Sequence, residues 1–376
     1  MTSDPKADRI QGSTLFRVLA LSKYGRVGAS SRLRFMQYRP WLQQSGIQVC
    51  MQPLLSDAMV TGLYSSGAYS PWSLLGAYFR RMGALLQRRK FDLLWIEKEA
   101  LPWTPFAFER ALLRRSLYVL DYDDAIFHQY DQHTNRFVRW VYGRRIDALM
   151  AGATLVVCGN GYLAKRARDA GAASVVVIPT VIDLDRYQIK NYGGSDLLQS
   201  FRPCIVWVGS PSTIRYLEVL RVPLAELARE FDFVLRVIGG DEFEMAGVNV
   251  EIVKWTEETE AESIRTADIG VMPLVDSAWE RGKCGYKLIQ YMASGLPVVA
   301  SHVGVNSEIV VQGHNGFLAK TALDWIAGLR ELLTSRQMRE RFGLAGRDRV
   351  ERFYCVQKAA PKLIEDFKLV MSSLSK

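Results

Sequence analysis

The sequence contains little cysteine and no long uncharged apolar stretch. Five of its 376 residues are cysteine and none falls in a CxxC pair, so neither a disulfide framework nor a structural zinc site is predicted. No uncharged apolar run approaches the roughly 20 residues that a membrane-spanning helix needs. Residues 1–13 are polar and lack the apolar core of a secretory signal. We therefore expect a cytoplasmic protein with reduced cysteines.

The length and the apolar content predict two folded domains. A chain of 376 residues is longer than one hydrophobic core usually serves. Apolar residues make up 49% of it, which excludes wholesale disorder.

The net charge of +9 belongs to the first half of the chain. Residues 1–185 hold 24 Lys and Arg against 15 Asp and Glu, a difference of +9, whereas residues 186–376 hold 24 of each. The excess is typical of either a solvated basic face or a surface for an anionic partner, such as phospholipid, a diphosphate-bearing substrate or nucleic acid. Basic clusters lie at residues 80–81, 88–90, 114–115 and 144–145.

Continuous apolar runs alternate with helical patterns in the first half. The runs predict buried strands at residues 16–22, 91–96, 117–123, 154–159 and 174–179. Amphipathic patterns predict helices at residues 32–44, 105–114 and 160–170. This alternation favours a parallel sheet that is covered on both faces.

The same pattern restarts after a polar stretch at residues 190–196, which we interpret as the linker region. Strands are predicted at residues 203–209, 233–240, 248–253, 269–272 and 298–301. We therefore predict an α/β fold of two tandem Rossmann-like, doubly wound domains, with ligands at the carboxyl ends of the strands in an interdomain cleft. The predicted parts are an N-terminal domain at 1–187, a C-terminal domain at 188–354, and a crossover helix at 355–376 that packs back on the first domain.

A candidate anion site follows the strand at residues 203–209. That strand ends at Gly209, and a loop with Ser210 and Ser212 leads into a helix. Free N–H groups and the dipole of a helix start attract anions, and Arg215 would add a planar donor suited to phosphate. The alternative is a capped turn with a surface arginine.

A second candidate is Lys287, near the start of a short apolar helix that ends before Gly295. A cation there opposes the helix dipole unless an anion is present. Gln290 lies three positions later, so both side chains can point the same way. They would suit a phosphate and a ribose hydroxyl, although a solvated lysine and a neutral glutamine remain the alternative.

The stretch YMASGLPVVAS, with Lys287 before it, resembles the donor half of GT-B glycosyltransferases, and more closely the retaining family 4 type. Other segments fit the same family in the expected order: residues 30–34, 121–126, 178–183, 207–213, 267–274, 304–310 and 315–318.

This resemblance implies a nucleotide-sugar donor held chiefly by the second domain. Arg215 and Lys287 would hold the diphosphate and neutralise the departing nucleotide, with no metal and no cofactor. Gly239 and Gly240 would line the base pocket. The partners would be a nucleoside-diphosphate sugar, a glycan or lipid-linked acceptor and, through the basic first domain, an anionic membrane.

One departure from the family pattern affects the sugar contacts. Family members usually carry two glutamates eight positions apart, where this chain has Gly282 and Gln290. Gln290 can still accept a hydrogen bond from ribose, and Glu280 is a candidate substitute for the missing glutamate. The departure leaves a non-catalytic homologue open.

The first half contributes candidate residues for the other wall of the cleft. Asp123 and Asp124 follow a predicted strand and could orient an acceptor or sugar hydroxyl. The DxD-like spacing of Asp121 and Asp123 could also suggest a metal, but GT-B sites seldom need one. His128 is either a proton carrier or an ordinary paired histidine. The loop after the first strand offers candidate acceptor-binding residues: Ser30, Ser31 and Arg32.

We therefore predict a retaining, metal-independent glycosyltransferase, catalytic through Asp123, Asp124, Arg215 and Lys287, in bacterial surface polysaccharide synthesis at the inner face of the plasma membrane. The alternatives are a nucleotide-sugar epimerase of the same fold and a non-catalytic nucleotide-binding protein. Nucleic-acid binding is disfavoured because the basic residues are scattered and no known module is present. A dehydrogenase is disfavoured because no GxGxxG follows the first strand.

Overall fold

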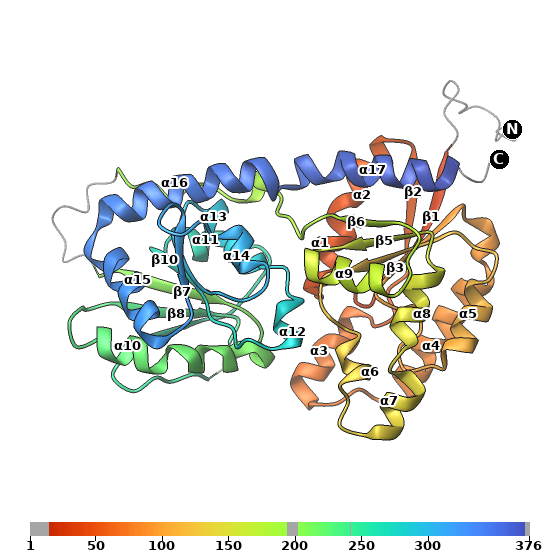
Figure 1. The fold of residues 1–376 in the computed structure, drawn as a ribbon, viewed down its shortest axis with the longest axis horizontal. Helices are drawn as coiled ribbons and strands as arrows, with labels where there is room; N and C mark the ends of the chain where they lie inside the picture. Colours follow the sequence, from red (N-terminus) through yellow and green to blue (C-terminus); the bar gives the residue numbers. More distant parts are fainter. Residues whose placement is uncertain (1–14, 194–201, 241, 373–376) are drawn as a thin grey trace, which may run out of the picture.

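The computed structural model describes residues 15–193, 202–240 and 242–372. Two six-stranded sheets, each wholly parallel, form two domains side by side (Figure 1). This confirms the predicted α/β fold of two tandem doubly wound domains. Part of the predicted linker, residues 194–196, lies outside the described residues.

The first sheet has the strand order β2-β1-β3-β4-β5-β6. Its strands are β1 (Phe16–Leu21), β2 (Ile47–Met51), β3 (Leu93–Glu97), β4 (Tyr118–Tyr122), β5 (Leu155–Cys158) and β6 (Val175–Val177). Its helices are α1 (Ala29–Arg34), η1 (Met36–Tyr38), α2 (Arg39–Gln44), α3 (Asp57–Ser66), α4 (Pro71–Leu86), η2 (Arg88–Lys90), α5 (Phe106–Leu113), α6 (His128–Asp131), α7 (Arg136–Tyr142), α8 (Arg145–Gly152), α9 (Gly161–Asp169) and η3 (Leu184–Arg186).

The second sheet has the strand order β12-β11-β10-β7-β8-β9. Its strands are β7 (Cys204–Val208), β8 (Val234–Ile238), β9 (Asn249–Val253), β10 (Ile269–Met272), β11 (Val298–Ser301) and β12 (Gly316–Ala319). The helices that follow residue 202 are η5 (Pro211–Leu220), α10 (Arg221–Leu227), α11 (Glu260–Arg265), α12 (Ala278–Arg281), α13 (Tyr286–Ala293), α14 (Asn306–Ile309), α15 (Ala322–Thr334), α16 (Arg336–Phe353) and α17 (Val356–Ser372).

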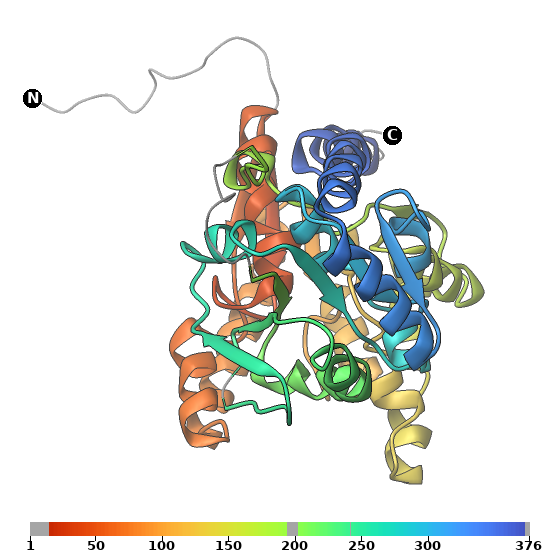
Figure 2. The same cartoon turned by 90° about the vertical axis from the view of Figure 1, so that its left-hand side faces the viewer.

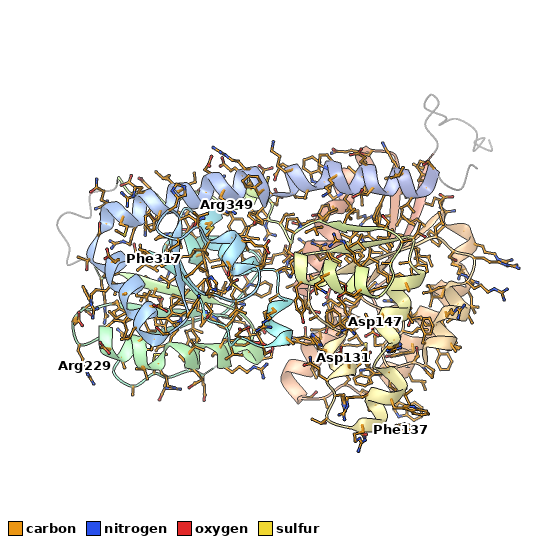
Figure 3. The ribbon with its side chains drawn as sticks, viewed as in Figure 1. Asp131, Phe137, Asp147, Arg229, Phe317 and Arg349 are labelled. Carbon is orange, nitrogen blue, oxygen red and sulfur yellow. The ribbon has the colours of Figure 1, made fainter. Side chains whose placement is uncertain are left out.

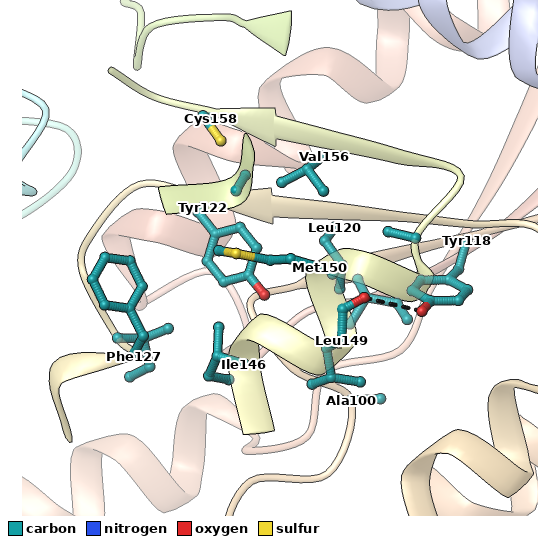
Figure 4. Close-up of a cluster of buried hydrophobic side chains, with 14 of the residues drawn as sticks. Ala100, Tyr118, Leu120, Tyr122, Phe127, Ile146, Leu149, Met150, Val156 and Cys158 are labelled. Carbon is teal, nitrogen blue, oxygen red and sulfur yellow. Dashed lines mark hydrogen bonds between the residues drawn. The ribbon is translucent and has the colours of Figure 1, made fainter. Parts of the chain in front are cut away.

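Two apolar layers sandwich the first sheet. Every residue of β3 and β4 is buried, as expected for strands that are covered on both faces. Tyr122 and Leu120 belong to one of these layers, where the hydroxyl of Tyr118 donates a hydrogen bond to the carbonyl of Leu149 (Figure 4). Burial of the strands fixes their register, so their carboxyl ends meet at one edge of the sheet.

The C-terminal helix returns to the first domain, as predicted. Its residues Val356, Leu363 and Phe367 belong to the core layer that also contains Trp95 of β3. The Phe367 ring meets the Trp95 ring edge-on, with 5.1 Å between centroids. Figures 1 and 2 show α16 and α17 in succession along one side of both domains.

Two strands and one helix differ from the sequence-based prediction. The strands β2 and β12 were not predicted; both lie at sheet edges, and β2 alternates buried with exposed residues, so it lacks a continuous apolar run. The helix predicted at residues 32–44 is divided into α1, η1 and α2. The break lies at Phe35, whose φ and ψ of −124° and −60° are not helical, and Pro40 lies in the first turn of α2, which begins at Arg39.

Among the described residues, none of the helices combines the length and the apolar character needed to cross a membrane.

Candidate functional site

A cavity of about 500 Å³ lies between the two domains, at the carboxyl ends of strands from both sheets. The strand order reverses between β1 and β3 in the first domain and between β7 and β10 in the second. Open α/β sheets bind ligands at such switch points, because the connections leave the sheet on opposite faces there. Both the fold and the cavity therefore place the candidate site where the sequence predicts it.

The second-domain wall of the cavity includes two glycines that allow a close backbone approach. Gly239 has a φ of +78°, and a Cβ atom on it would lie 2.3 Å from the carbonyl oxygen of Gly209. A side chain at position 239 would separate the ends of β7 and β8, and one at position 209 would collide with the ring of Trp207. The wall therefore presents open backbone to the cavity, as the approach of a phosphate or a base requires.

Two lysines of the second domain line the cavity. Lys287 lies in the first turn of α13, as predicted, and its Nζ atom lies 5.5 Å from the ring centroid of Trp207. The Nζ atom of Lys283 lies 5.6 Å from the ring centroid of Tyr216. Burial, with the nearby Lys283 charge, lowers the pKa of Lys287 to about 8, although Glu260 acts in the opposite direction. An anion bound between these lysines would restore the charged form.

Arg215 is not among the described residues that line the cavity. It is exposed, and its guanidinium lies 5.4 Å from the ring centroid of Tyr216. The segment that carries it, η5, is a 3₁₀ helix, and the N–H of Ser210 at its start already donates to the Thr213 hydroxyl. The role of Arg215 as a diphosphate ligand stays a prediction.

Lys283 was missed by the sequence analysis, although it lies only four positions before Lys287. The basic residues in RGKCGYK could have indicated a second cation in the anion site. The sequence pattern does not show that the loop before α13 directs the Lys283 side chain toward the same cavity.

Gln290 lines the cavity beside a small hydrogen-bonded group. Its amide donates to the Tyr187 hydroxyl at 3.0 Å, and that hydroxyl donates to Glu260 at 3.3 Å. The indole of Trp255 donates to the other oxygen of Glu260 at 2.7 Å. Trp255 and Glu260 also line the cavity and were not predicted. Together these residues offer hydrogen-bonding groups and an aromatic face on the second-domain wall.

Other predicted donor residues lie outside the cavity lining of the described chain. The Glu280 carboxylate is buried and accepts hydrogen bonds from the hydroxyls of Tyr216 and Ser277. Ser212 is exposed, with its hydroxyl 3.0 Å from that of Ser210. Gly240 packs near Ile214. Their donor contacts stay predictions.

The first domain explains why position 282 is a glycine. A Cβ atom on Gly282 would lie 2.5 Å from the Cβ atom of Ala125 and 2.9 Å from its backbone nitrogen. A side chain at this position would push the first domain away. The glutamate that the family usually has here therefore does not fit this interdomain arrangement.

Asp123 and Asp124 line the cavity from the first domain and share one buried cation. Lys98 places its Nζ atom 2.9 Å from Asp123 Oδ1 and 2.8 Å from Asp124 Oδ2. Burial opposes ionisation of Asp123, but Lys98 and the Ser30 hydroxyl outweigh it and lower its pKa. The Asp123 carboxylate therefore favours its ionised form and can accept hydrogen bonds from hydroxyls in the cavity.

Lys98 follows β3 directly and has a φ of +63°. Such a backbone is costly for a residue with a side chain, and strain of this kind concentrates at functional sites. This lysine was not predicted from the sequence, because the loop after β3 reaches the cleft only through tertiary packing.

The three predicted acceptor residues have different surroundings. Ser30 lines the cavity. Ser31 is buried and donates to Glu97 at 2.5 Å, so it shapes the loop and lies outside the described lining. Arg32 lines the cavity, and its guanidinium lies 5.1 Å from the centroid of the Trp255 ring in the second domain.

The two domains also contact each other beneath the cavity. The Asn160 amide donates to the carbonyls of Gly282 and Lys283, at 2.9 and 3.0 Å, and its oxygen caps α9. The Cys284 thiol donates to the carbonyl of Asp123 at 3.0 Å. These bonds join the lysine-bearing loop to the aspartate-bearing loop.

Within the described chain, no three or more His, Cys, Asp and Glu residues are grouped as a metal site would require. Asp121, which belongs to the DxD-like spacing, is paired with Arg34 at 2.7 Å. His128 is paired with Asp131 and with the Tyr162 hydroxyl, as an ordinary structural histidine would be. Independence from metals and cofactors stays a prediction.

Comparison with known proteins shows which family the second domain matches and which fold the whole chain shares. Residues 202–335, most of the second domain, match the family described as Glycosyl transferases group 1. The whole fold is similar to that of sucrose-phosphate synthase from Thermosynechococcus elongatus, with a TM-score of 0.72 and 14% identity over 95% of this chain and 100% of the other. The chain therefore has the GT-B fold, and its second domain matches the group 1 glycosyltransferase family.

Two further solved structures share this fold. Anabaena HepE, solved with UDP-glucose, has a TM-score of 0.68 and 15% identity, with 94% of this chain and 99% of HepE covered. WaaG, a glycosyltransferase involved in lipopolysaccharide biosynthesis, has a TM-score of 0.62 and 17% identity, with 92% and 98% covered.

A curated relative matches over a shorter segment. Spore coat protein SA of Bacillus subtilis (strain 168) is 30% identical over 80 residues, which are 20% of this chain. The match spans 21% of the length of that protein.

Proposed function

We propose that this protein transfers a sugar from a nucleoside-diphosphate sugar, bound in the interdomain cavity, to a hydroxyl group of a glycan or lipid-linked acceptor. The observation that carries the proposal is the pair of partly buried lysines, Lys283 and Lys287, beside the open glycine wall of the cavity. Neither lysine forms an ion pair with a carboxylate of the described residues, which favours a ligand of high negative charge such as a diphosphate.

The lysines would also supply much of the catalysis. Negative charge grows on the departing nucleoside diphosphate as the bond to the sugar breaks. The two ammonium groups that line the cavity would stabilise that charge, so the proposed transfer needs no metal ion. Retention of the anomeric configuration is part of the proposal, and NMR of the product would test it.

The first-domain wall suits the acceptor. Asp123, whose pKa is lowered, and Asp124 could orient the hydroxyl that attacks, and Ser30 donates a hydrogen bond to Asp123. The same wall also contains apolar side chains: Val27, Leu33, Val60, Leu63 and two tyrosines. An acceptor that is polar at one end and apolar at the other would match it. We therefore include surface polysaccharide synthesis at the inner membrane face in the proposal.

The donor test should begin with UDP-sugars, because HepE, which shares the fold, was solved with UDP-glucose. A ligand that binds only the folded state raises its melting temperature. The expected result is one nucleotide sugar that stabilises the protein most and is consumed when an acceptor is present. Turnover of that sugar without any acceptor would instead indicate an epimerase, and no stabilisation by any of them would contradict the proposal.

Substitution Lys287→Ala tests the site directly. It removes a charge-assisted contact worth about 1.5–3 kcal/mol, so donor affinity should fall roughly tenfold to hundredfold. Calorimetric titration with the best nucleotide sugar would measure this. Lys320→Ala is the matched control, because Lys320 is an exposed lysine of the same domain outside the cavity lining. Equal affinities in the two variants would remove Lys287 from the site.

A further inference from the structure

Helix α4 carries an apolar stripe that the described chain leaves uncovered. Trp72, Leu75, Phe79 and Leu86 are exposed, with 82% of Trp72 and 63% of Phe79 accessible. Their spacings of three, four and seven residues place them on one side of a helix. The stripe extends for about 21 Å along the helix axis. We call these four side chains the α4 face.

The α4 face is distinct from the side of the helix that packs on the domain. Ala77, Arg81 and Leu85 form the buried side, and Leu85 belongs to the core of the first domain. The exposed side chains are therefore not required to hold α4 in place. Monomeric proteins seldom expose large apolar side chains in a row, and such rows mark interaction sites.

Basic residues accompany the α4 face. Residues 71–90 contain five Lys or Arg residues and no acidic residue. Four of them, Arg80, Arg88, Arg89 and Lys90, form no ion pair with the described residues. The surface is thus both apolar and positively charged, and no carboxylate of the described residues neutralises these four charges.

We propose that the α4 face docks on an anionic phospholipid surface, with its apolar stripe in the interface and Arg80, Arg88, Arg89 and Lys90 against the headgroups. Amphipathic helices rich in Trp, Phe, Leu and Arg bind membranes in this way. A second copy of the chain is a poorer occupant, because the excess of +9 in residues 1–185 would bring like charges together.

The position of α4 connects the docking surface to the cavity. Ala77 of α4 packs in a small apolar cluster with Val60 of α3, and Tyr69 packs against the same cluster. Val60 and Tyr69 also line the cavity. Docking of the α4 face would therefore provide the contact surface for the membrane location proposed above. It would also bring the apolar residues of the acceptor wall close to the lipid.

Vesicle flotation of the full chain tests this inference without any nucleotide sugar or acceptor, so its failure is separate from failure of glycosyl transfer. The protein should bind vesicles of phosphatidylglycerol and phosphatidylcholine, bind pure phosphatidylcholine far less, and lose binding as salt increases. The double variant Trp72→Ser, Phe79→Ser should bind at least tenfold more weakly. Neutralising Arg88, Arg89 and Lys90 to glutamine should weaken binding by on the order of a hundredfold.

Matched controls lie on the second domain. Val222→Ser, Leu323→Ser removes two equally exposed apolar side chains, and Arg229→Gln removes an exposed charge at the end of the molecule far from the first domain (Figure 3). Both controls should bind vesicles as the unchanged protein does. Absence of binding to anionic vesicles, or equal loss in the controls, would overturn the inference. The inference would also be overturned if the α4 substitutions abolished a concentration-dependent dimer or an RNA complex while vesicle binding persisted.

Discussion

At the scale of single residues, Lys287 shows how an unfavourable position becomes useful. It lies in the first turn of α13, where the helix dipole repels a cation. Burial and the Lys283 charge lower its pKa to about 8. The site is therefore destabilised when empty and is relieved by an anion.

The pH dependence of donor binding follows from this shift. Below pH 8 Lys287 is charged and should bind the diphosphate; above about pH 8 the empty site loses its proton, so affinity should decrease progressively as the pH rises. Calorimetric titration between pH 6.5 and 9.5 (a range of about three pH units around the shifted value) would measure it. Lys287→Ala should show a flatter profile. An unchanged affinity over this range would contradict the assignment.

Lys98 is the buried cation that supports the aspartate side of the cavity. It is the ion-pair partner of Asp123 and Asp124, and Glu97 is buried nearby. Lys98→Met would leave these carboxylates without their cation, which costs about 3 kcal/mol or more in buried pairs. The melting temperature should therefore fall, and transfer activity with it.

The control for Lys98 is Lys165→Met. Lys165 pairs with Asp169 on an exposed helix surface, with 75% and 57% of the two side chains accessible. Its removal should change stability by less than about 0.5 kcal/mol. If Lys98→Met melts at the same temperature as Lys165→Met, the buried pair does not support the cavity wall.

At the scale of elements, α7 is unusual because none of its seven residues is buried although it contains Phe137, Val138, Trp140 and Val141. The rings of Phe137 and Trp140 lie 5.8 Å apart, and Phe137 points outward from the end of the first domain (Figure 3). The helix contributes little to the core.

The double variant Phe137→Ser, Trp140→Ser should therefore melt within about 2 °C of the unchanged protein, because exposed side chains add little to stability. Phe127→Ala, which removes a buried ring of the neighbouring core, should lower the melting temperature by roughly 10 °C. Thermal unfolding followed by circular dichroism would measure both. A large loss in the α7 variant would indicate packing that these contacts do not explain.

At the scale of the whole molecule, one carboxylate links the two domains beside the cavity. Glu257 of the second domain accepts bonds from Arg26, at 2.9 and 3.0 Å, and from Arg186, at 3.0 Å. The guanidinium of Arg32 is 4.0 Å from the same carboxylate. Near it, residues Ile182 and Cys355 form a bridge where the chain crosses between the domains.

Glu257→Gln should loosen the contact between the domains and lower donor affinity by about threefold to tenfold, since a network of pairs is worth more than one exposed pair. Small-angle scattering would report a larger radius of gyration. Glu230→Gln is the matched control, because Glu230 forms a similar two-bond pair with Arg330 within the second domain. A radius unchanged from that control would show that Glu257 does not hold the domains together.

The sequence alone predicts the two parallel sheets, because strands that are buried on both faces are continuous apolar runs, as in β3 and β4. It also placed Lys287 at a helix start and Asp123 after a strand, since both positions depend on local chain order. The edge strand β2 was not predicted, because its buried and exposed residues alternate and leave no continuous apolar run.

Only the tertiary structure decided which side chains share the cavity. Lys98 and Lys283 entered the site through the paths of their loops, and Arg215 stayed outside the described lining. The glycine at position 282 is explained by Ala125, a residue 157 positions earlier (282 minus 125). Contacts between distant segments depend on how the two domains meet, and no local pattern of apolar or charged residues encodes that geometry.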